Sequence, residues 1–215
     1  EAIPDTAAPD APPRAAAEAT AFGHPRGLAT LFFTEMWERF TYYGIQSILI
    51  LFMVAGSGRG GLGFGDQSAN AVVGLYFGGT YLLSLLGGWV ADRLIGGRHA
   101  VAAGGVLITA GNAMLASGGT RLFFLGLVFN VLGVGLLKPN VSATVGELYP
   151  EGGSRRDAGF SIFYMGINIG SLLGPMFVPV VARHYGWHAG FALPALGMLF
   201  GVAQFLATRR YLGTA

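Results

Sequence analysis

Three ionisable side chains, Glu35, Glu38 and Arg39, stand inside an apolar stretch that runs from about residue 27 to residue 54. A charge in hydrocarbon costs at least ~2.5 kcal/mol, and charges inside membrane segments usually mark a path for substrate or protons. At 100° per residue these three side chains and Tyr42 share one stripe of a helix. Their i, i+3 and i, i+4 spacing lets two carboxylates and one guanidinium share charge and protons. The stripe indicates a functional path; the alternative is a buried ion cluster that only holds helices together.

A fourth charge inside an apolar stretch is Lys138, the only lysine in the chain, in the segment Lys138-Pro139-Asn140. A buried lysine needs a carboxylate partner to remain charged, and Glu35 and Glu38 are the obvious partners. Pro139 should kink or loosen its helix and free a carbonyl group. The alternative is that Lys138 reaches back to the membrane interface.

Other polar residues accompany the apolar stretches. Tyr81 and Asn168 lie in the second and fifth of them, where they could contact a ligand or only join helices. Asp92, Arg93 and Arg98 follow the second stretch. Asp92 opposes the dipole of the helix that it ends, unless it caps another helix or pairs with a neighbouring arginine. Such a contact could latch a cytoplasmic gate, or it could be a static surface ion pair.

Composition points to a membrane protein. The chain has 215 residues, of which 53% are hydrophobic and 11% charged, against ~25% charged in a soluble domain. The absence of cysteine excludes disulfides and thiolate metal sites. The basic residues are scattered, which argues against a nucleic-acid partner. With no nucleophile–base set and no metal-ligand spacing, we expect neither an enzyme nor a cofactor.

The apolar stretches predict an all-α integral membrane protein with six transmembrane helices, each near the ~20 residues that span a bilayer. Residues 1–26, rich in Ala and Pro, are expected to be a disordered cytoplasmic tail. Residues 27–210 would form the bundle, and residues 211–215 would be the start of a linker or a truncated end. The expected helices cover residues 27–55, 68–92, 98–117, 121–146, 157–182 and 187–208.

The distribution of arginine predicts that both ends of the chain are cytoplasmic in a multi-pass protein of the cell membrane. Eight arginines fall on the side of the termini: Arg14, Arg26, Arg93, Arg98, Arg155, Arg156, Arg209 and Arg210. Three fall on the other side: Arg59, Arg121 and Arg183.

The motifs resemble those of the proton-coupled oligopeptide transporters (POT), a branch of the major facilitator superfamily. The segment Glu35-x-x-Glu38-Arg39-Phe40-x-Tyr42-Tyr43-Gly44 matches the first-helix motif of that branch at seven specified positions. Residues 88–98 resemble the loop motif between its second and third helices. The segment Phe163-Tyr164-x-x-Ile167-Asn168-x-Gly170-Ser171 resembles its fifth-helix signature, and Lys138 stands where the branch has a fourth-helix lysine.

This resemblance implies the N-terminal half of a major facilitator fold, whose C-terminal six-helix bundle is missing here. It implies symport of di- and tripeptides with protons as the coupling ion. Glu35, Glu38, Arg39 and Lys138 would couple protons. The peptide would meet Arg39, Tyr42, Tyr43, Tyr81, Lys138 and Asn168, and Asp92, Arg93 and Arg98 would belong to the gate. The alternatives are a transporter of nitrate or other anions, or a membrane interaction module that transports nothing.

Overall fold

The computed structural model describes residues 20–21 and 23–212, and its described part is built from six long helices. Residues 1–19 of the expected tail and residues 213–215 of the expected linker lie outside the described residues. The helices are α1 (Arg26–Val54), α2 (Asp66–Val90), α3 (Gly97–Ser117), α4 (Thr120–Glu147), α5 (Gly153–Tyr185) and α6 (Trp187–Thr208).

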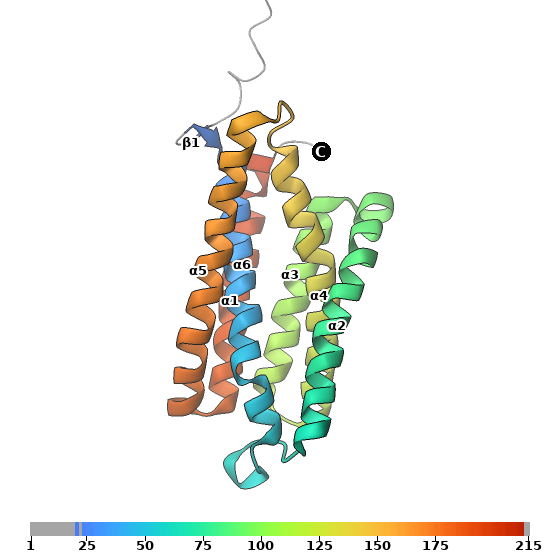
Figure 1. Ribbon diagram of the computed structural model, residues 1–215, viewed down its shortest axis with the longest axis vertical. Coiled ribbons are helices and arrows are strands. Elements are labelled where there is room, and N and C mark those ends of the chain that lie inside the picture. Colours follow the sequence, from blue (N-terminus) through green and yellow to red (C-terminus); the bar gives the residue numbers. More distant parts are fainter. Residues whose placement is uncertain (1–19, 22, 213–215) are drawn as a thin grey trace, which may run out of the picture.

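Five of these helices, α2 to α6, are long and apolar enough to cross a membrane by length and composition. The remaining helix, α1, has 29 residues and carries Glu35, Glu38 and Arg39 in its middle. The chain is therefore an all-helical, multi-pass membrane protein. The long helices run side by side along one axis (Figure 1).

Two groups of three helices make up the bundle. α1 packs along α5 and α6, and α4 packs along α2 and α3, while α3 and α6 join the two groups. Short connections link the helices, among them the 3₁₀ turn η2 (Ser57–Arg59) between α1 and α2. In this arrangement α1 packs against α5 on one side. The polar stripe of α1, with Glu35, Glu38 and Arg39, lies toward the group formed by α2, α3 and α4.

The close packing of α1 and α5 depends on a glycine seam. A methyl group at Gly166, Gly170 or Gly174 would collide with the backbone carbonyl of Phe32, Met36 or Phe40, respectively. Small residues at four-residue spacing let membrane helices approach this closely. The seam thereby fixes the register between α5 and the turns of α1 that carry the charged residues.

The helix boundaries agree with the expected ranges to within two residues, except at α5. α5 begins four residues earlier and ends three residues later than the expected range 157–182. α2 ends at Val90 and continues as a π-helical turn, η3 (Ala91–Ile95), because Gly96, at φ 80°, reverses the chain there. α4 continues through Pro139 to Glu147, so the proline does not end it.

Two short strands lie within the range of the expected tail. Strands β1 (Thr20–Ala21) and β2 (His24–Pro25) form a two-stranded antiparallel pair before α1. The ring of His24 is hydrogen-bonded to the hydroxyl of Tyr149 at 2.8 Å, and Arg155 donates to the carbonyl of Gly23 at 3.0 Å. Burial of the Tyr149 side chain raises its pKa and keeps this hydroxyl neutral. These contacts order residues 23–25 against the α4–α5 connection.

Candidate functional site

The centre of the site is an ion cluster on α1. Arg39 Nε lies 3.1 Å from Glu35 Oε1 and also donates to Glu38 Oε2. The exposed fractions of Glu35, Glu38 and Arg39 are 3%, 0% and 5%. The i, i+4 spacing predicted this cluster, because residues one helical turn apart lie on the same face.

The cluster leaves polar atoms without partners. Glu35 Oε2, Glu38 Oε1 and Arg39 Nη2 are buried and make no hydrogen bond in the described structure. Buried polar groups are normally hydrogen-bonded, so unpartnered ones often belong to functional sites. Two carboxylate oxygens could accept a proton here, and one guanidinium nitrogen could donate to an anion.

Aromatic rings surround the guanidinium. Its Cζ lies 5.0 Å from the ring centroid of Tyr42 and 6.0 Å from that of Tyr43. Tyr42 stacks on Tyr76 of α2, with 6.4 Å between centroids and 23° between planes. The rings hold the cation by cation–π contact and limit its movement. Tyr42 and Tyr43 were predicted as peptide contacts, and the structure brings both to Arg39.

Lys138 does not form the expected ion pair. Among the described residues, neither Glu35 nor Glu38 lies within 4.0 Å of its ammonium group. Its Nζ instead lies over the ring of Tyr81, 5.0 Å from the centroid. The distance between Lys138 and the two glutamates could not be predicted from the helical period, because it depends on how α4 packs beside α1. The structure does join Lys138 and Tyr81, two of the predicted contacts.

Asn140, the residue after Pro139, links α4 to α2 by a hydrogen bond. Asn140 is buried, and its amide donates to Leu136 O at 2.6 Å and to Gly87 O at 3.3 Å. Pro139 cannot bond to the carbonyl of Gly135, and a side chain at Gly87 would collide with that carbonyl. As expected, the proline frees a carbonyl group, and the freed carbonyl lies against the backbone of α2.

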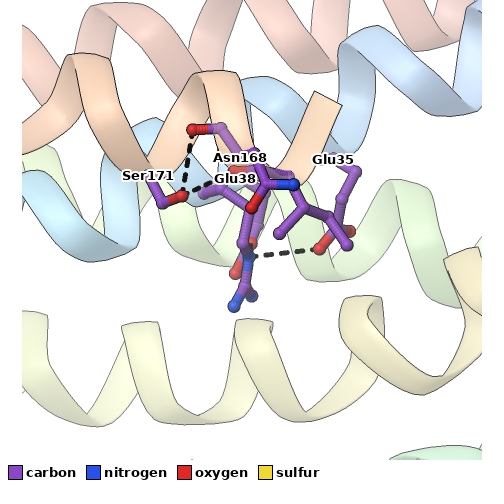
Figure 2. Close-up of polar contacts among 6 residues, drawn as sticks. Glu35, Glu38, Asn168 and Ser171 are labelled. Carbon is purple, nitrogen blue, oxygen red and sulfur yellow. Dashed lines mark hydrogen bonds and ion pairs between the residues drawn. The ribbon is translucent and has the colours of Figure 1, made fainter. Parts of the chain in front are cut away.

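Asn168 lies on the turn of α5 that packs beside the ion cluster (Figure 2). A methyl group at Gly170, two residues away, would stand 2.9 Å from Arg39 Cβ. The hydroxyl of Ser171 donates to the carbonyls of Ile167 and Asn168, at 2.8 Å and 3.1 Å. The side chain of Asn168 is exposed, as a ligand contact requires.

The residues predicted for the gate do not pair with one another. Asp92 and Arg93 are exposed, and within the described chain Asp92 makes no ion pair. Arg98 donates to the backbone carbonyl of Leu212 at 2.8 Å, in the 3₁₀ turn η4 (Arg209–Leu212). Asp92 and Arg93 lie in the π-helical turn η3, where the expected pairing of Asp92 with Arg93 or Arg98 does not form. A gate role for these three residues stays a prediction.

Sequence reasoning left out one buried tyrosine, Tyr76, as a site residue. Tyr76 is 3% exposed and supports the ring of Tyr42 from α2. The polar row on the second helix, with Tyr76 and Thr80 one turn apart, was the signal that could have identified it. That row could mark Tyr76 as a candidate, but it could not give Tyr42 as its partner, because the contact joins two helices.

Taken together, the fold and this cluster define a class: a multi-pass helical membrane protein with a buried, incompletely satisfied ion cluster. Within the described residues, no group of three metal-ligating side chains occurs. A sequence profile described as the POT family matches residues 98–213, more than half of the chain. The chain therefore belongs to the POT family, which confirms the resemblance of its motifs.

Two named transporters are similar in sequence to this chain. The chain is 49% identical over 189 residues to the peptide transporter YePEPT of Yersinia enterocolitica, covering 86% of this chain and 37% of that protein. It is 47% identical over 191 residues to a di-/tripeptide transporter of Lactococcus lactis, covering 87% of this chain and 38% of that protein. The chain thus spans less than half of the relatives it matches, and those relatives are named as transporters rather than enzymes.

Solved structures of POT transporters are similar to this chain in fold and sequence. A peptide transporter POT in complex with sulfate matches with a TM-score of 0.89 and 50% identity, covering 92% of this chain and 41% of that chain. A POT family transporter in complex with a thioalcohol-conjugated peptide matches with a TM-score of 0.87 and 42% identity, covering 90% and 40%.

Proposed function

We propose that this chain is the N-terminal six-helix half of a proton-coupled symporter of di- and tripeptides with a major facilitator fold. The observation that carries the proposal is the buried Glu35–Arg39–Glu38 cluster, with its unpartnered oxygens and nitrogen, in a chain similar to named peptide transporters. In such a fold the binding site lies between two bundles near the middle of the membrane. The second bundle is the partner that would complete it.

In the proposed mechanism, binding of a proton to a glutamate favours binding of the peptide to Arg39. With both glutamates ionised, both carboxylates bind Arg39 through Nε. Protonation of one glutamate weakens its ion pair with Arg39. The guanidinium of Arg39 then binds the peptide carboxylate, whose two oxygens fit the planar pair of N–H donors. Because the two glutamates share one partner, they titrate as a coupled pair.

The other predicted residues take roles around this exchange. Tyr42 and Tyr43 support Arg39, while Lys138 over Tyr81 offers a second cation and Asn168 an amide. Asp92, Arg93 and Arg98 would open and close the cytoplasmic end, where both termini would lie. Alternating access then requires the C-terminal bundle.

The test is uptake of a labelled dipeptide into proteoliposomes that hold the full-length transporter, with and without an inward proton gradient. We expect gradient-driven accumulation that unlabelled dipeptides inhibit and nitrate does not. Inhibition by nitrate and not by dipeptide would assign the site to anions, and no uptake of either by folded protein would favour an interaction module.

Two variants connect the activity to the cluster. Glu38→Gln keeps the shape of the side chain and removes its charge, and Lys138→Ala removes the second cation. Both should abolish accumulation against a gradient. Ser117→Ala is a suitable control, since this exposed serine at the end of α3 bonds only to its own helix, at Ala113 O. Accumulation by either cluster variant at the control level would contradict the proposed coupling.

A further inference from the structure

Two cavities lie along α1, and the first is on the side that faces away from the ion cluster. It has a volume of about 360 Å³ and a mostly apolar surface, and it is lined by Arg26, Ala29, Thr30, Phe33, Gln204, Thr208 and Tyr211. The second, of about 390 Å³, lies further along the same helix at Met36 and is lined almost wholly by apolar side chains. We call the surface formed by both cavities the α1 furrow.

The α1 furrow opens toward lipid. At 100° per residue, Ala29 lies roughly 100° and Phe33 roughly 140° around α1 from the middle of the stripe of Glu35 and Arg39. If that stripe faces the transport path between the bundles, the opposite side faces the membrane. Phe33 is accordingly 44% exposed, as a lipid-facing side chain would be.

The mouth of the furrow holds two guanidinium groups on one ring. Arg26 Cζ lies 5.8 Å and Arg210 Cζ 5.0 Å from the ring centroid of Tyr211, and Arg210 Nη2 donates to the Tyr211 hydroxyl at 3.1 Å. Both arginines are exposed, and neither makes an ion pair with any residue in the described ranges. Arginine suits phosphate because it donates two parallel hydrogen bonds.

From the mouth of the first cavity to the second, the α1 furrow covers about the depth of one leaflet. Ten residues separate Arg26 from Met36, which is ~15 Å along a helix and half of a ~30 Å hydrocarbon core. We propose that the α1 furrow binds one anionic phospholipid, with its phosphate on Arg26 and Arg210 and an acyl chain along Ala29 and Phe33. A cationic mouth above an apolar groove fits this occupant in charge and in polarity.

Native mass spectrometry of the full-length transporter, titrated with phosphatidylglycerol or phosphatidylcholine, tests this proposal. We expect one phosphatidylglycerol to remain bound in preference to phosphatidylcholine. Arg26→Gln and Arg210→Gln should each weaken phosphatidylglycerol binding about fivefold, from the usual contribution of one arginine near a membrane surface. Arg156→Gln is the matched control, because Arg156 is exposed at the same end of the bundle on α5 and should change binding less than twofold.

Ala29→Trp tests the acyl-chain part independently. Ala29 is exposed, so a large side chain there fills the groove without entering the core. We expect this variant to lose bound phosphatidylglycerol while it elutes and melts like the parent. The proposal is overturned if Ala29→Trp binds the lipid normally, if Arg156→Gln weakens binding as much as Arg26→Gln, or if soluble glycerol phosphate displaces the lipid.

Discussion

Replacement of Gly170 by alanine tests whether the α1–α5 seam positions the ion cluster. A methyl group at Gly170 would lie 2.9 Å from Arg39 Cβ and 2.9 Å from Phe40 N, and still closer to the carbonyl of Met36. Two of these three atoms belong to the backbone and cannot rotate away. To reach a normal separation of ~3.5 Å, α5 must move from α1 by more than the ~0.6 Å that Arg39 Cβ and Phe40 N alone require, because the carbonyl of Met36 is closer still.

The size of the effect follows from two opposing terms. Overpacking in a tight interior costs about 1–3 kcal/mol of unfolding free energy. Alanine in place of glycine inside a helix returns up to about 1 kcal/mol. Gly146→Ala measures the second term alone, because its nearest neighbour is the flexible end of Arg156 at 3.8 Å. Relative to Gly146→Ala, we expect Gly170→Ala to be about 1–3 kcal/mol less stable.

The assay is unfolding of the full-length transporter in detergent, followed by dipeptide uptake after reconstitution. Gly170→Ala should melt below Gly146→Ala and should transport far more slowly, since a displacement approaching 1 Å at a reacting group can cost ~10²-fold in rate. If Gly170→Ala melts with Gly146→Ala and transports normally, the seam does not position Arg39 and the reasoning is refuted.

Two further outcomes are expected elsewhere in the molecule. Asn140→Leu removes the hydrogen bonds to Leu136 O and Gly87 O and should lower the unfolding free energy by about 1–2 kcal/mol in a denaturation experiment; unchanged stability would contradict a role in joining α2 to α4. Tyr149→Phe removes the partner of His24 and should speed proteolytic cleavage near residues 23–25, whereas an equal cleavage rate would show that Arg155 alone holds this segment.

The sequence predicted those parts of the site that lie on one helix. The four-residue period brought Glu35 and Arg39 together correctly. The partner of Lys138 was predicted wrongly, because the distance between α4 and α1 is set by packing rather than by period. The π-helical turn that carries Asp92 and Arg93 was not predicted either, because no residue pattern in this segment indicates it.

A single nitrogen atom explains how the proposed coupling could occur without a large rearrangement. Both carboxylates use Arg39 Nε, so they compete for one N–H group, while Nη2 makes no bond in the described structure. A proton on Glu35 Oε2 or Glu38 Oε1 would end that competition in favour of the other glutamate. It would also raise the net charge of the cluster by one, which strengthens the attraction of the free end of the guanidinium for a peptide carboxylate. Proton and peptide would thus bind to opposite ends of one buried cluster, and each would favour the binding of the other.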